Sequence, residues 1–282
     1  MLNFIKMHGL GNDFIMVEDL KEKLSEQSLS KLAVELCDRK FGIGADGLVL
    51  ILTSTKADIR MRIFNPDGSE PEMCGNAIRC FGKLAWEEGL VTKTDITVET
   101  LAGIIKPQLT LKGDDIEAIR VDMGEPILKR ENIPMSGTGT SPVIGEEIII
   151  NSGQGFKFTA VSMGNPHCII FVDDVEDIPL IQWGPELEKH NLFPRKTNVE
   201  FVQVLTPEHV KMRVWERGAG ETLACGTGAC ATAVASILND KTGRKVKVSL
   251  ARGDLDIEWS KDNNRVYMTG PATKVFTGQV KI

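Results

Sequence analysis

The chain has 282 residues, of which 42% are hydrophobic and 26% are charged, and this composition is typical of a soluble protein with one large or two ordinary domains. The formal net charge of −6 argues against nucleic acid or an anionic membrane as the main partner. No apolar run is long enough to cross a bilayer, and residues 1–14 lack a secretory signal, so we expect a cytoplasmic protein without a membrane partner.

In chain order, apolar runs and alternating residues predict a mixture of strands and helices. The first half contains predicted strands at residues 11–17, 47–51, 57–65, 96–100 and 103–111, and predicted helices at 28–38 and 76–89. The second half contains predicted strands at residues 164–170, 198–202, 209–217, 245–259 and 264–270, and a predicted helix at 226–240. The helix at 28–38 has amphipathic spacing, whereas those at 76–89 and 226–240 start with small and apolar residues, which favours burial on nearly all sides.

The chain also repeats itself. Residues 61–76 (MRIFNPDGSEPEMCGN) align without a gap with residues 212–227 (MRVWERGAGETLACGT), at an offset of 151 residues. Cys74 then aligns with Cys225, and a glycine follows each of them. The earlier strands match in the same order at nearly the same offset. The sequence therefore predicts an α/β fold of two homologous halves, each a curved mixed sheet or barrel around a central helix, with a boundary near residues 121–126.

The six cysteines are at positions 37, 74, 80, 168, 225 and 230. Stable disulfides are not expected in a cytoplasmic chain, and there is no C-x-x-C pair. A zinc site made of Cys74, Cys80, Cys225 and Cys230 is formally possible, but the gaps inside each pair suit it poorly. We expect Cys37, Cys80 and Cys230 to be core residues, and we expect no bound metal.

Cys74 and Cys225 are different because each precedes a glycine at the start of a predicted buried helix. A helix N-terminus lowers the pKa of a thiol, and its unpaired N–H groups bind carboxylates. If the halves face each other, one thiolate can remove a proton from a carbon while the opposite thiol protonates the other face. This pattern predicts stereoinversion without a cofactor, since no phosphate-binding motif or Schiff-base lysine stands out.

The repeat is broken at positions that could hold the unsymmetrical part of a substrate. Asn65 aligns with Glu216, Pro66 aligns with Arg217, and Gly47 aligns with Asn198. Glu216 and Arg217 are therefore either substrate-binding groups or an ordinary exposed pair at the end of a strand.

Six segments resemble the diaminopimelate epimerase family across the whole chain. They are KMHGLGNDF (6–14), GIGADG (42–47), FNPDGSEPEMCGNAIRC (64–80), SMGNPHCIIFV (162–172), TNVEFV (197–202) and VWERGAGETLACGTGACA (214–231). The resemblance implies a cofactor-independent epimerase that interconverts LL- and meso-diaminopimelate for lysine and peptidoglycan synthesis, with its site in the cleft between two similar domains. It also implies that the chain end returns to the first domain, giving domains of 1–122 plus 271–282 and of 123–270.

The resemblance assigns roles by motif. Cys74 and Cys225 are implied to be the acid–base pair, and His167 and Glu216 are implied to tune these thiols. The backbone of Gly75, Asn76, Gly226 and Thr227 is implied to bind the reacting carboxylate. The rest of the substrate would be held by Asn12, Asn65, Asn165, Asn198, Glu216 and Arg217. Some family members have glutamine where this chain has Gly47, and Tyr267 matches a position linked to contact in a homodimer.

Other functions share parts of this pattern. Proline racemases resemble the chain in their Cys-Gly motifs but lack this set of asparagines with Glu216 and Arg217. A thiol-redox protein could use Cys74 and Cys225 as a disulfide switch, and a zinc-binding structural module would use the same thiols as ligands.

Overall fold

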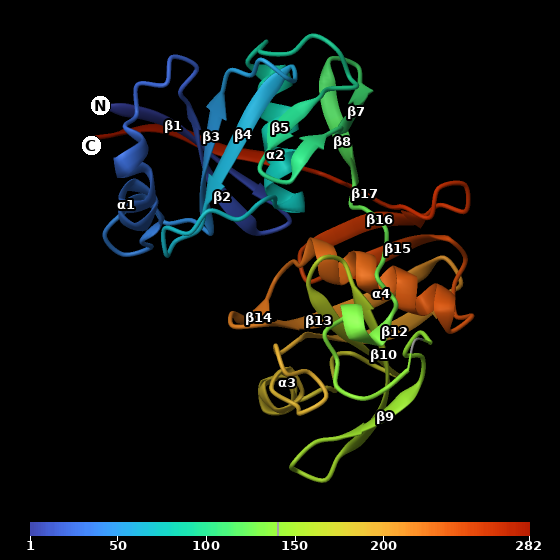
Figure 1. Ribbon diagram of the computed structural model, residues 1–282. Helices are drawn as coiled ribbons and strands as arrows, with labels where there is room; N and C mark the ends of the chain where they lie inside the picture. The colour runs from blue at the N-terminus through green and yellow to red at the C-terminus, as the bar shows by residue number, and fades with distance from the viewer. Residues whose placement is uncertain (140) are drawn as a thin grey trace. The chain divides into compact units, whose positions relative to one another are not determined.

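The computed structural model describes residues 1–139 and 141–282, and the chain divides into two compact units (Figure 1). The first unit contains Met1–Asp122 and Thr269–Ile282, and the second contains Met123–Met268. Among the described residues, no helix is both long and apolar enough to span a membrane.

The first unit consists mainly of strands, with two helices. The helices are α1 (Glu26–Cys37) and α2 (Gly75–Glu87). The strands are β1 (Leu2–Gly9), β2 (Asn12–Glu18), β3 (Gly47–Leu52), β4 (Ile59–Phe64), β5 (Val98–Thr100), β6 (Gly103–Ile105), β7 (Gln108–Lys112), β8 (Asp115–Asp122) and β18 (Thr273–Val280).

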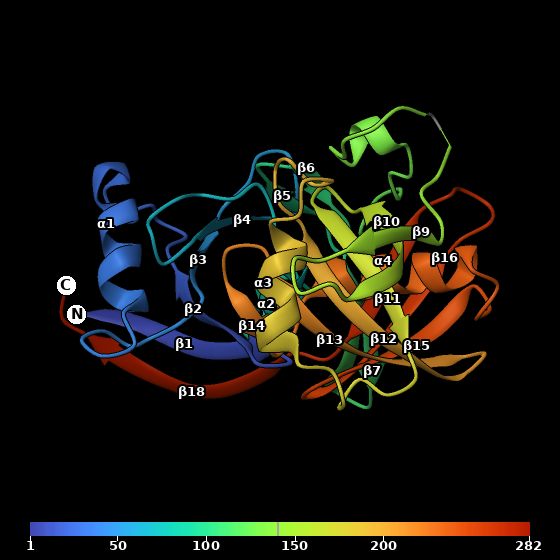
Figure 2. The same ribbon diagram turned by 90° about the horizontal axis from the view of Figure 1, so that it is seen from below.

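Seven strands of the first unit form one sheet in the order β18-β1-β2-β3-β4-β5-β6. β2 and β3 are parallel, and the connection between them contains α1, as a parallel pair requires a long crossover. β18 pairs antiparallel with β1, so the end of the chain completes the sheet in which the chain begins (Figure 2). Within the described residues this sheet ends at β18 and at β6 and is therefore open, so the barrel considered from the sequence is wrong.

The second unit has the same kind of architecture. Its helices are the short 3-10 helix η1 (Arg130–Asn132), α3 (Leu180–Glu188) and α4 (Gly226–Leu238). Its strands are β9 (Glu146–Ile149), β10 (Gly155–Ser162), β11 (Pro166–Val172), β12 (Asn198–Thr206), β13 (His209–Glu216), β14 (Gly220–Thr222), β15 (Lys245–Leu250), β16 (Gly253–Trp259) and β17 (Val266–Gly270). The sheet contains the run β17-β16-β15-β13-β12-β11-β10-β9, and β14 pairs with β13.

The two units confirm the internal repeat at the level of topology. In the first unit β1, β2, β3 and β4 pair in sequence as antiparallel, parallel and antiparallel neighbours. In the second unit β10, β11, β12 and β13 pair with the same three directions in the same order. One helix crosses between the parallel strands of each unit, and a second helix follows the fourth strand.

This second helix is central in each unit. α2 packs against β1, β2, β3, β4 and β8, and α4 packs against β10, β11, β12, β13, β15 and β16. Figure 1 shows α4 lying across the strands of its own sheet. α4 is buried along most of its length because its residues are mostly Ala, Gly and Val, which let strands approach closely.

Two predicted strands are in fact divided. The segment 103–111 forms β6 and β7, which pair with different neighbours, because Pro107 lies between them and has no N–H for the ladder. The segment 245–259 folds back on itself as the β15–β16 hairpin. Gly253 at its turn has a φ of 141°, which side chains rarely tolerate.

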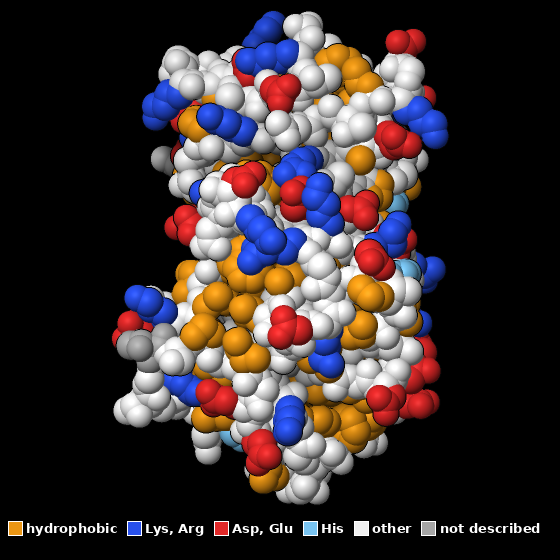
Figure 3. Space-filling view, turned by 90° about the vertical axis from the view of Figure 1, so that its right-hand side faces the viewer, with side chains coloured by type: hydrophobic (Ala, Val, Ile, Leu, Met, Phe, Trp, Pro, Cys, Tyr) orange, Lys and Arg blue, Asp and Glu red, His pale blue; other side chains and the backbone are white. Residues whose placement is uncertain are grey.

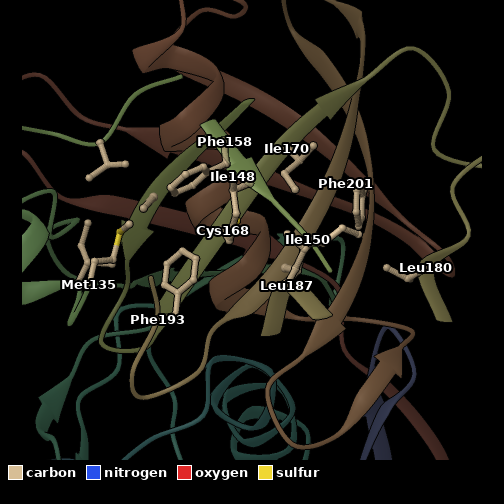
Figure 4. Packing of buried hydrophobic residues seen from close by; sticks show 14 residues of the cluster. Met135, Ile148, Ile150, Phe158, Cys168, Ile170, Leu180, Leu187, Phe193 and Phe201 are labelled. Atoms are coloured by element: carbon tan, nitrogen blue, oxygen red, sulfur yellow. The ribbon is translucent and has the colours of Figure 1, made fainter. Parts of the chain in front are cut away.

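A hydrophobic cluster covers the face of β11 and β12 that points away from α4 (Figure 4). Phe158 and Phe193 meet edge to face there, with ring centroids 5.9 Å apart. Cys168 and Phe201 point into this cluster and are fully buried. Because side chains alternate along a strand, their neighbours on β11 and β12 point to the opposite face, toward α4.

On the face shown in Figure 3, acidic and basic side chains are interspersed with each other and with exposed hydrophobic atoms. Charges of one sign are not gathered into a single large area on that face.

Candidate active site

The two cysteines that the repeat aligns occupy the same place in their units. Cys74 is the N-cap of α2 and Cys225 is the N-cap of α4, and both have extended backbone angles. The first N–H groups of each helix, beginning with Gly75 and Gly226, have no partner within the helix. Each unit therefore presents a thiol beside a set of N–H groups that favour an anion.

In the first unit, Cys74 lies beside two asparagines. Asn76 donates from Nδ2 to Asn12 Oδ1 at 2.9 Å, and Cys74 Sγ lies 4.0 Å from the same oxygen. The Nδ2 of Asn12 donates to Asp46 at 2.8 Å, which fixes the orientation of the Asn12 amide. Asn76 is buried, and its Oδ1 has no hydrogen-bond partner in the described part of the chain.

Asn65 and Gly47 lie on the adjoining strand ends. Asn65 closes a tight turn, since its N–H donates to Ser69 O at 2.8 Å and its Nδ2 donates to Ser69 Oγ at 2.9 Å. Gly47 begins β3, and a Cβ at this position would lie 3.1 Å from Phe64 O. A side chain at this position would therefore require the neighbouring backbone or Phe14 to shift by a few tenths of an ångström.

In the second unit, Cys225 is 5% exposed and its sulfur is held by the first turn of α4. Gly228 N–H donates to Cys225 Sγ at 3.3 Å, and Thr227 Oγ1 lies 3.5 Å from the same sulfur. Burial nevertheless raises the pKa of the Cys225 thiol well above its usual value, and the carboxylates of Glu216 and Glu200 raise it further. The expected lowering of the thiol pKa is therefore wrong for Cys225, because burial and two carboxylates outweigh two hydrogen bonds.

His167 and Glu200 form a buried pair beneath this corner. His167 Nδ1 lies 2.7 Å from Glu200 Oε1, and both side chains have no exposed surface. His167 Nε2 lies 3.0 Å from Asn165 Oδ1, and Asn165 Nδ2 donates to Thr227 Oγ1 at 3.2 Å. Asn165 and His167, both expected at the site, are thus brought into one hydrogen-bonded group with Thr227.

Glu216 ends β13 on the same side of the unit. Its carboxylate accepts a hydrogen bond from Thr222, on the short strand β14 that folds back against β13. Burial raises the pKa of Glu216, while hydrogen bonds from Thr222 and from Cys225 oppose the rise. Glu216 is therefore a half-buried carboxyl group in direct contact with the thiol of Cys225, and the surface-pair interpretation does not fit its surroundings.

Asn198 uses its amide to hold the neighbouring backbone. Its Nδ2 donates to Pro166 O at 2.8 Å, and its Oδ1 accepts from Arg217 N at 2.9 Å. The side chain of Arg217 is exposed and donates to Arg195 O at 3.3 Å. Asn198 thus fixes the turn from which the guanidinium of Arg217 extends.

The remaining expected residues fall outside these two groups. Tyr267 lies half-buried on β17, and its hydroxyl accepts from Asn263 Nδ2 at 2.8 Å. Burial raises the pKa of Cys37 to about 11 and that of Cys80 to about 12, which agrees with inert core thiols. Within residues 1–139 and 141–282, no three His, Cys, Asp or Glu side chains are grouped so as to hold a metal ion.

Sequence reasoning missed two residues of these groups, Glu200 and Asp46. Glu200 could have been noticed because a glutamate stands alone between Val199 and Phe201 in an apolar strand. A charged residue on the covered face of a strand needs a buried partner. Asp46 follows a glycine-rich turn, and the sequence alone did not connect it with Asn12.

Sequence comparison finds a family whose model covers both Cys74 and Cys225. The family model described as diaminopimelate epimerase matches residues 4–129 and 159–275. The chain is 60% identical over 277 residues to a diaminopimelate epimerase of Moorella thermoacetica, covering 98% of each chain. It is 54% identical over 281 residues to that of Methanococcus maripaludis, covering 100% of each chain.

Solved structures with the same fold are more distant in sequence. A phenazine biosynthesis protein of the PhzF family from Bacillus anthracis matches with a TM-score of 0.72 at 19% identity, covering 100% of this chain and 99% of that one. A probable proline racemase from Agrobacterium radiobacter, with bound carbonate, matches with a TM-score of 0.70 at 16% identity, covering 100% and 93%. At these identities the likeness shows the fold alone.

Proposed function

Because the chain belongs to the diaminopimelate epimerase family and is an isomerase, we propose that it interconverts LL- and meso-diaminopimelate by a two-thiol mechanism. Cys74 and Cys225 are the two acid–base groups. The observation that carries this assignment is the repeat itself, because both units place a cysteine as the N-cap of their central helix.

The reaction exchanges one proton for another on the same carbon. One thiolate removes the α-hydrogen as a proton and becomes a thiol, while the opposite thiol gives its proton to the other face and becomes a thiolate. The reverse reaction exchanges these roles, so each cysteine must work in both protonation states. General acid–base groups placed in this way typically contribute about 10²–10⁴-fold to a rate.

In this proposal the α-carboxylate accepts hydrogen bonds from the N-terminal N–H groups of α2 and α4. The N–H groups of Gly75 and Asn76 on α2 and of Gly226 and Thr227 on α4 are the donors, because first-turn amides lack partners within a helix. As the proton leaves, negative charge grows on this carboxylate, and fixed donors stabilise it without rearranging. The chain therefore needs no metal or pyridoxal cofactor for the step.

The far end of the substrate is held by groups that the repeat does not duplicate. The exposed guanidinium of Arg217 suits the distal carboxylate, which it can bind with two parallel hydrogen bonds. The ammonium group on the reacting carbon suits the carboxylate of Glu216, because this carboxylate contacts the thiol of Cys225. The amides of Asn12, Asn65 and Asn165 complete the binding site, and Asn198 acts by holding the backbone of Arg217.

The cellular role follows as part of the same proposal. The family supports a function in amino-acid biosynthesis, and we place the reaction on the route to lysine and peptidoglycan precursors in the cytoplasm. The working form is proposed to be a homodimer in which Tyr267 lies at the contact between subunits. Sedimentation of the wild type and of a Tyr267→Ala variant tests this part separately from catalysis.

Hydrogen exchange tests the function directly. LL-diaminopimelate incubated with the protein in deuterated water should gain one deuterium at its α-carbon as meso-diaminopimelate appears. Proline under the same conditions should gain none. Exchange into proline but not into diaminopimelate would show that the substrate assignment is wrong, even though the two-thiol chemistry would stand.

A further inference from the structure

A continuous line of hydrogen-bonded side chains in the second unit joins a buried carboxylate to the sulfur of Cys225. It passes from Glu200 to His167, then to Asn165, and then to Thr227, whose hydroxyl oxygen lies 3.5 Å from Cys225 Sγ. β12 supplies Glu200, β11 supplies His167, the bend before β11 supplies Asn165, and the start of α4 supplies Thr227 and its N-cap Cys225. Sequence reasoning assigned a role to four of these residues but none to Glu200.

The burial of Glu200 determines which atoms donate in this line of hydrogen bonds. Its side chain has no exposed surface, and its Oε2 has no hydrogen-bond partner in the described residues. Its contact is with His167, because a fully buried carboxyl group needs a hydrogen-bond partner. The ring of His167 is therefore held with Nδ1 facing Glu200 Oε1 and with Nε2 facing Asn165 Oδ1.

The orientation of the His167 ring determines which atoms donate and which accept in the hydrogen bonds from Asn165 to Cys225. When Nε2 donates to Asn165 Oδ1, the amide nitrogen of Asn165 faces Thr227 and donates to its oxygen. The single hydroxyl proton of Thr227 is then free to point at Cys225 Sγ. If Nε2 accepted a hydrogen bond instead, the Asn165 amide would turn over, and Thr227 would donate to Asn165 rather than to the sulfur of Cys225.

We propose that Glu200 is a positioning residue that holds the His167 ring with Nε2 as a donor to Asn165 and thereby directs the Thr227 hydroxyl to donate to the Cys225 sulfur. The proposal rests on the proposed function in one respect, namely that Cys225 acts as an acid–base group. The new element is that the line of hydrogen-bonded side chains favours the thiolate form of Cys225, which this residue needs when it acts as the base. Cys74 has different neighbours, Asn12 and Asn76, in the other unit.

Glu200 also acts on the sulfur through space, and in the opposite sense. Two carboxylates face Cys225, Glu216 from β13 and Glu200 from β12, and both raise the pKa of its thiol in addition to burial. The Thr227 hydroxyl and the Gly228 N–H lower it. Removal of the negative charge at position 200 therefore lowers the pKa of the Cys225 thiol if repulsion dominates. It raises that pKa if the hydrogen-bonded line dominates.

The rate at which iodoacetamide alkylates Cys225 separates these effects, because only the thiolate reacts. The rate is measured on the full-length protein without substrate at one fixed pH, with peptide mass spectrometry locating the modified cysteine. Glu200→Gln should slow alkylation of Cys225 roughly five- to tenfold, the value of one hydrogen bond to the sulfur. Thr227→Val should slow it by the same factor, whereas Thr227→Ser, which keeps the hydroxyl, should stay within about twofold of the wild type.

The double variant Glu200→Gln/Thr227→Val gives the sharpest result. If both residues act through one line, the double variant should react no more slowly than Thr227→Val alone, since coupled residues are not additive. Alkylation of Cys74 in the same samples should be unchanged and serves as the internal control.

Three results would overturn the proposal: faster or unchanged alkylation of Cys225 in Glu200→Gln, additive slowing in the double variant, or equal rates in Thr227→Ser and Thr227→Val. The last comparison remains available if Glu200→Gln does not fold. The assay needs no turnover, so failure of the proposed epimerase activity would be seen separately, in the exchange of hydrogen into diaminopimelate.

Discussion

Gly228 is the position where one added methyl group should damage catalysis more than stability. It lies in the first turn of α4, and a Cβ built there would lie 2.7 Å from Glu200 Oε1 and 3.1 Å from Cys225 Sγ. Ordinary contacts begin at 3.4 Å, so the carboxylate must move by about 0.7 Å. Both neighbours are buried, and the sulfur is the group that the mechanism uses.

The effect of Gly228→Ala on folding should be small. Overpacking a buried site costs about 1–3 kcal/mol, whereas alanine in place of glycine within a helix gains up to about 1 kcal/mol. The free energy of unfolding should therefore fall by no more than about 2 kcal/mol. The effect on the reaction should be larger, because a misplacement of about 1 Å can reduce a rate about 10²-fold. We expect kcat/KM for diaminopimelate to fall at least about tenfold.

The repeat and the first unit supply the controls. Ala77 stands at the position equivalent to Gly228, so a methyl group is compatible with this turn where no carboxylate lies beside it. Gly82→Ala in α2 places its methyl group 3.3 Å from the end of the flexible Leu109 side chain and should leave kcat/KM within about twofold. Epimerisation is followed by separation of the stereoisomers, and folding by denaturant unfolding. If Gly228→Ala folds and keeps the wild-type kcat/KM, the crowding of Cys225 does not matter for catalysis and the reasoning fails.

Four further predictions address the proposed mechanism. Cys74→Ala and Cys225→Ala should each reduce epimerisation by at least about 10²–10⁴-fold, and near-normal turnover in either would rule out the two-thiol mechanism. Arg217→Lys should raise KM for diaminopimelate strongly with a smaller change in kcat, since lysine cannot form a planar bidentate contact; unchanged KM would remove Arg217 from the binding site. With a reductant present, activity should survive prolonged EDTA and hydroxylamine and should disappear with a thiol alkylator, more slowly when substrate is bound. Recovery that depends on added metal or pyridoxal phosphate would contradict this. Because the pKa of Glu216 is raised in the folded protein, its contribution to stability is present at low pH and is lost as pH rises through that raised value. In denaturant unfolding, the free energy of unfolding of Glu216→Gln minus that of the wild type should therefore be more positive at pH 7 than at pH 4. The opposite order would contradict the burial of this carboxyl group.

The central architecture could be predicted because the sequence contains it as an internal repeat. The aligned Cys-Gly pairs at 74 and 225 lie at equivalent helix starts, and the strands before them pair in equivalent order. Local features that depend on one residue were harder to predict. A single proline, Pro107, divides what reads as one continuous strand, and α3 contains Pro185, which weakens any helical pattern.

The places of the candidate site residues in the fold could be predicted, but not their electrostatics. Sequence alone places Cys225 at a helix N-terminus, from which a lowered thiol pKa follows. The raised pKa results first from burial of the thiol and then from Glu216 and Glu200, which lie 9 and 25 residues earlier in the chain and reach the sulfur only after β12 and β13 pair. Such a balance of burial and charge depends on tertiary contacts, which cannot be predicted from the spacing of residues in the sequence.

The unlike surroundings of the two thiols have a chemical consequence for a reaction that must run both ways. Cys74 is half-buried with Asn12 and Asn76 beside it, whereas burial and the carboxylate of Glu216 raise the pKa of the Cys225 thiol. In the free protein this favours a proton on Cys225. In the proposed mechanism, the ammonium group on the reacting carbon brings positive charge to Glu216 and so changes this balance. The difference between the surroundings of Cys74 and Cys225 would then set which thiol acts as the acid in each direction.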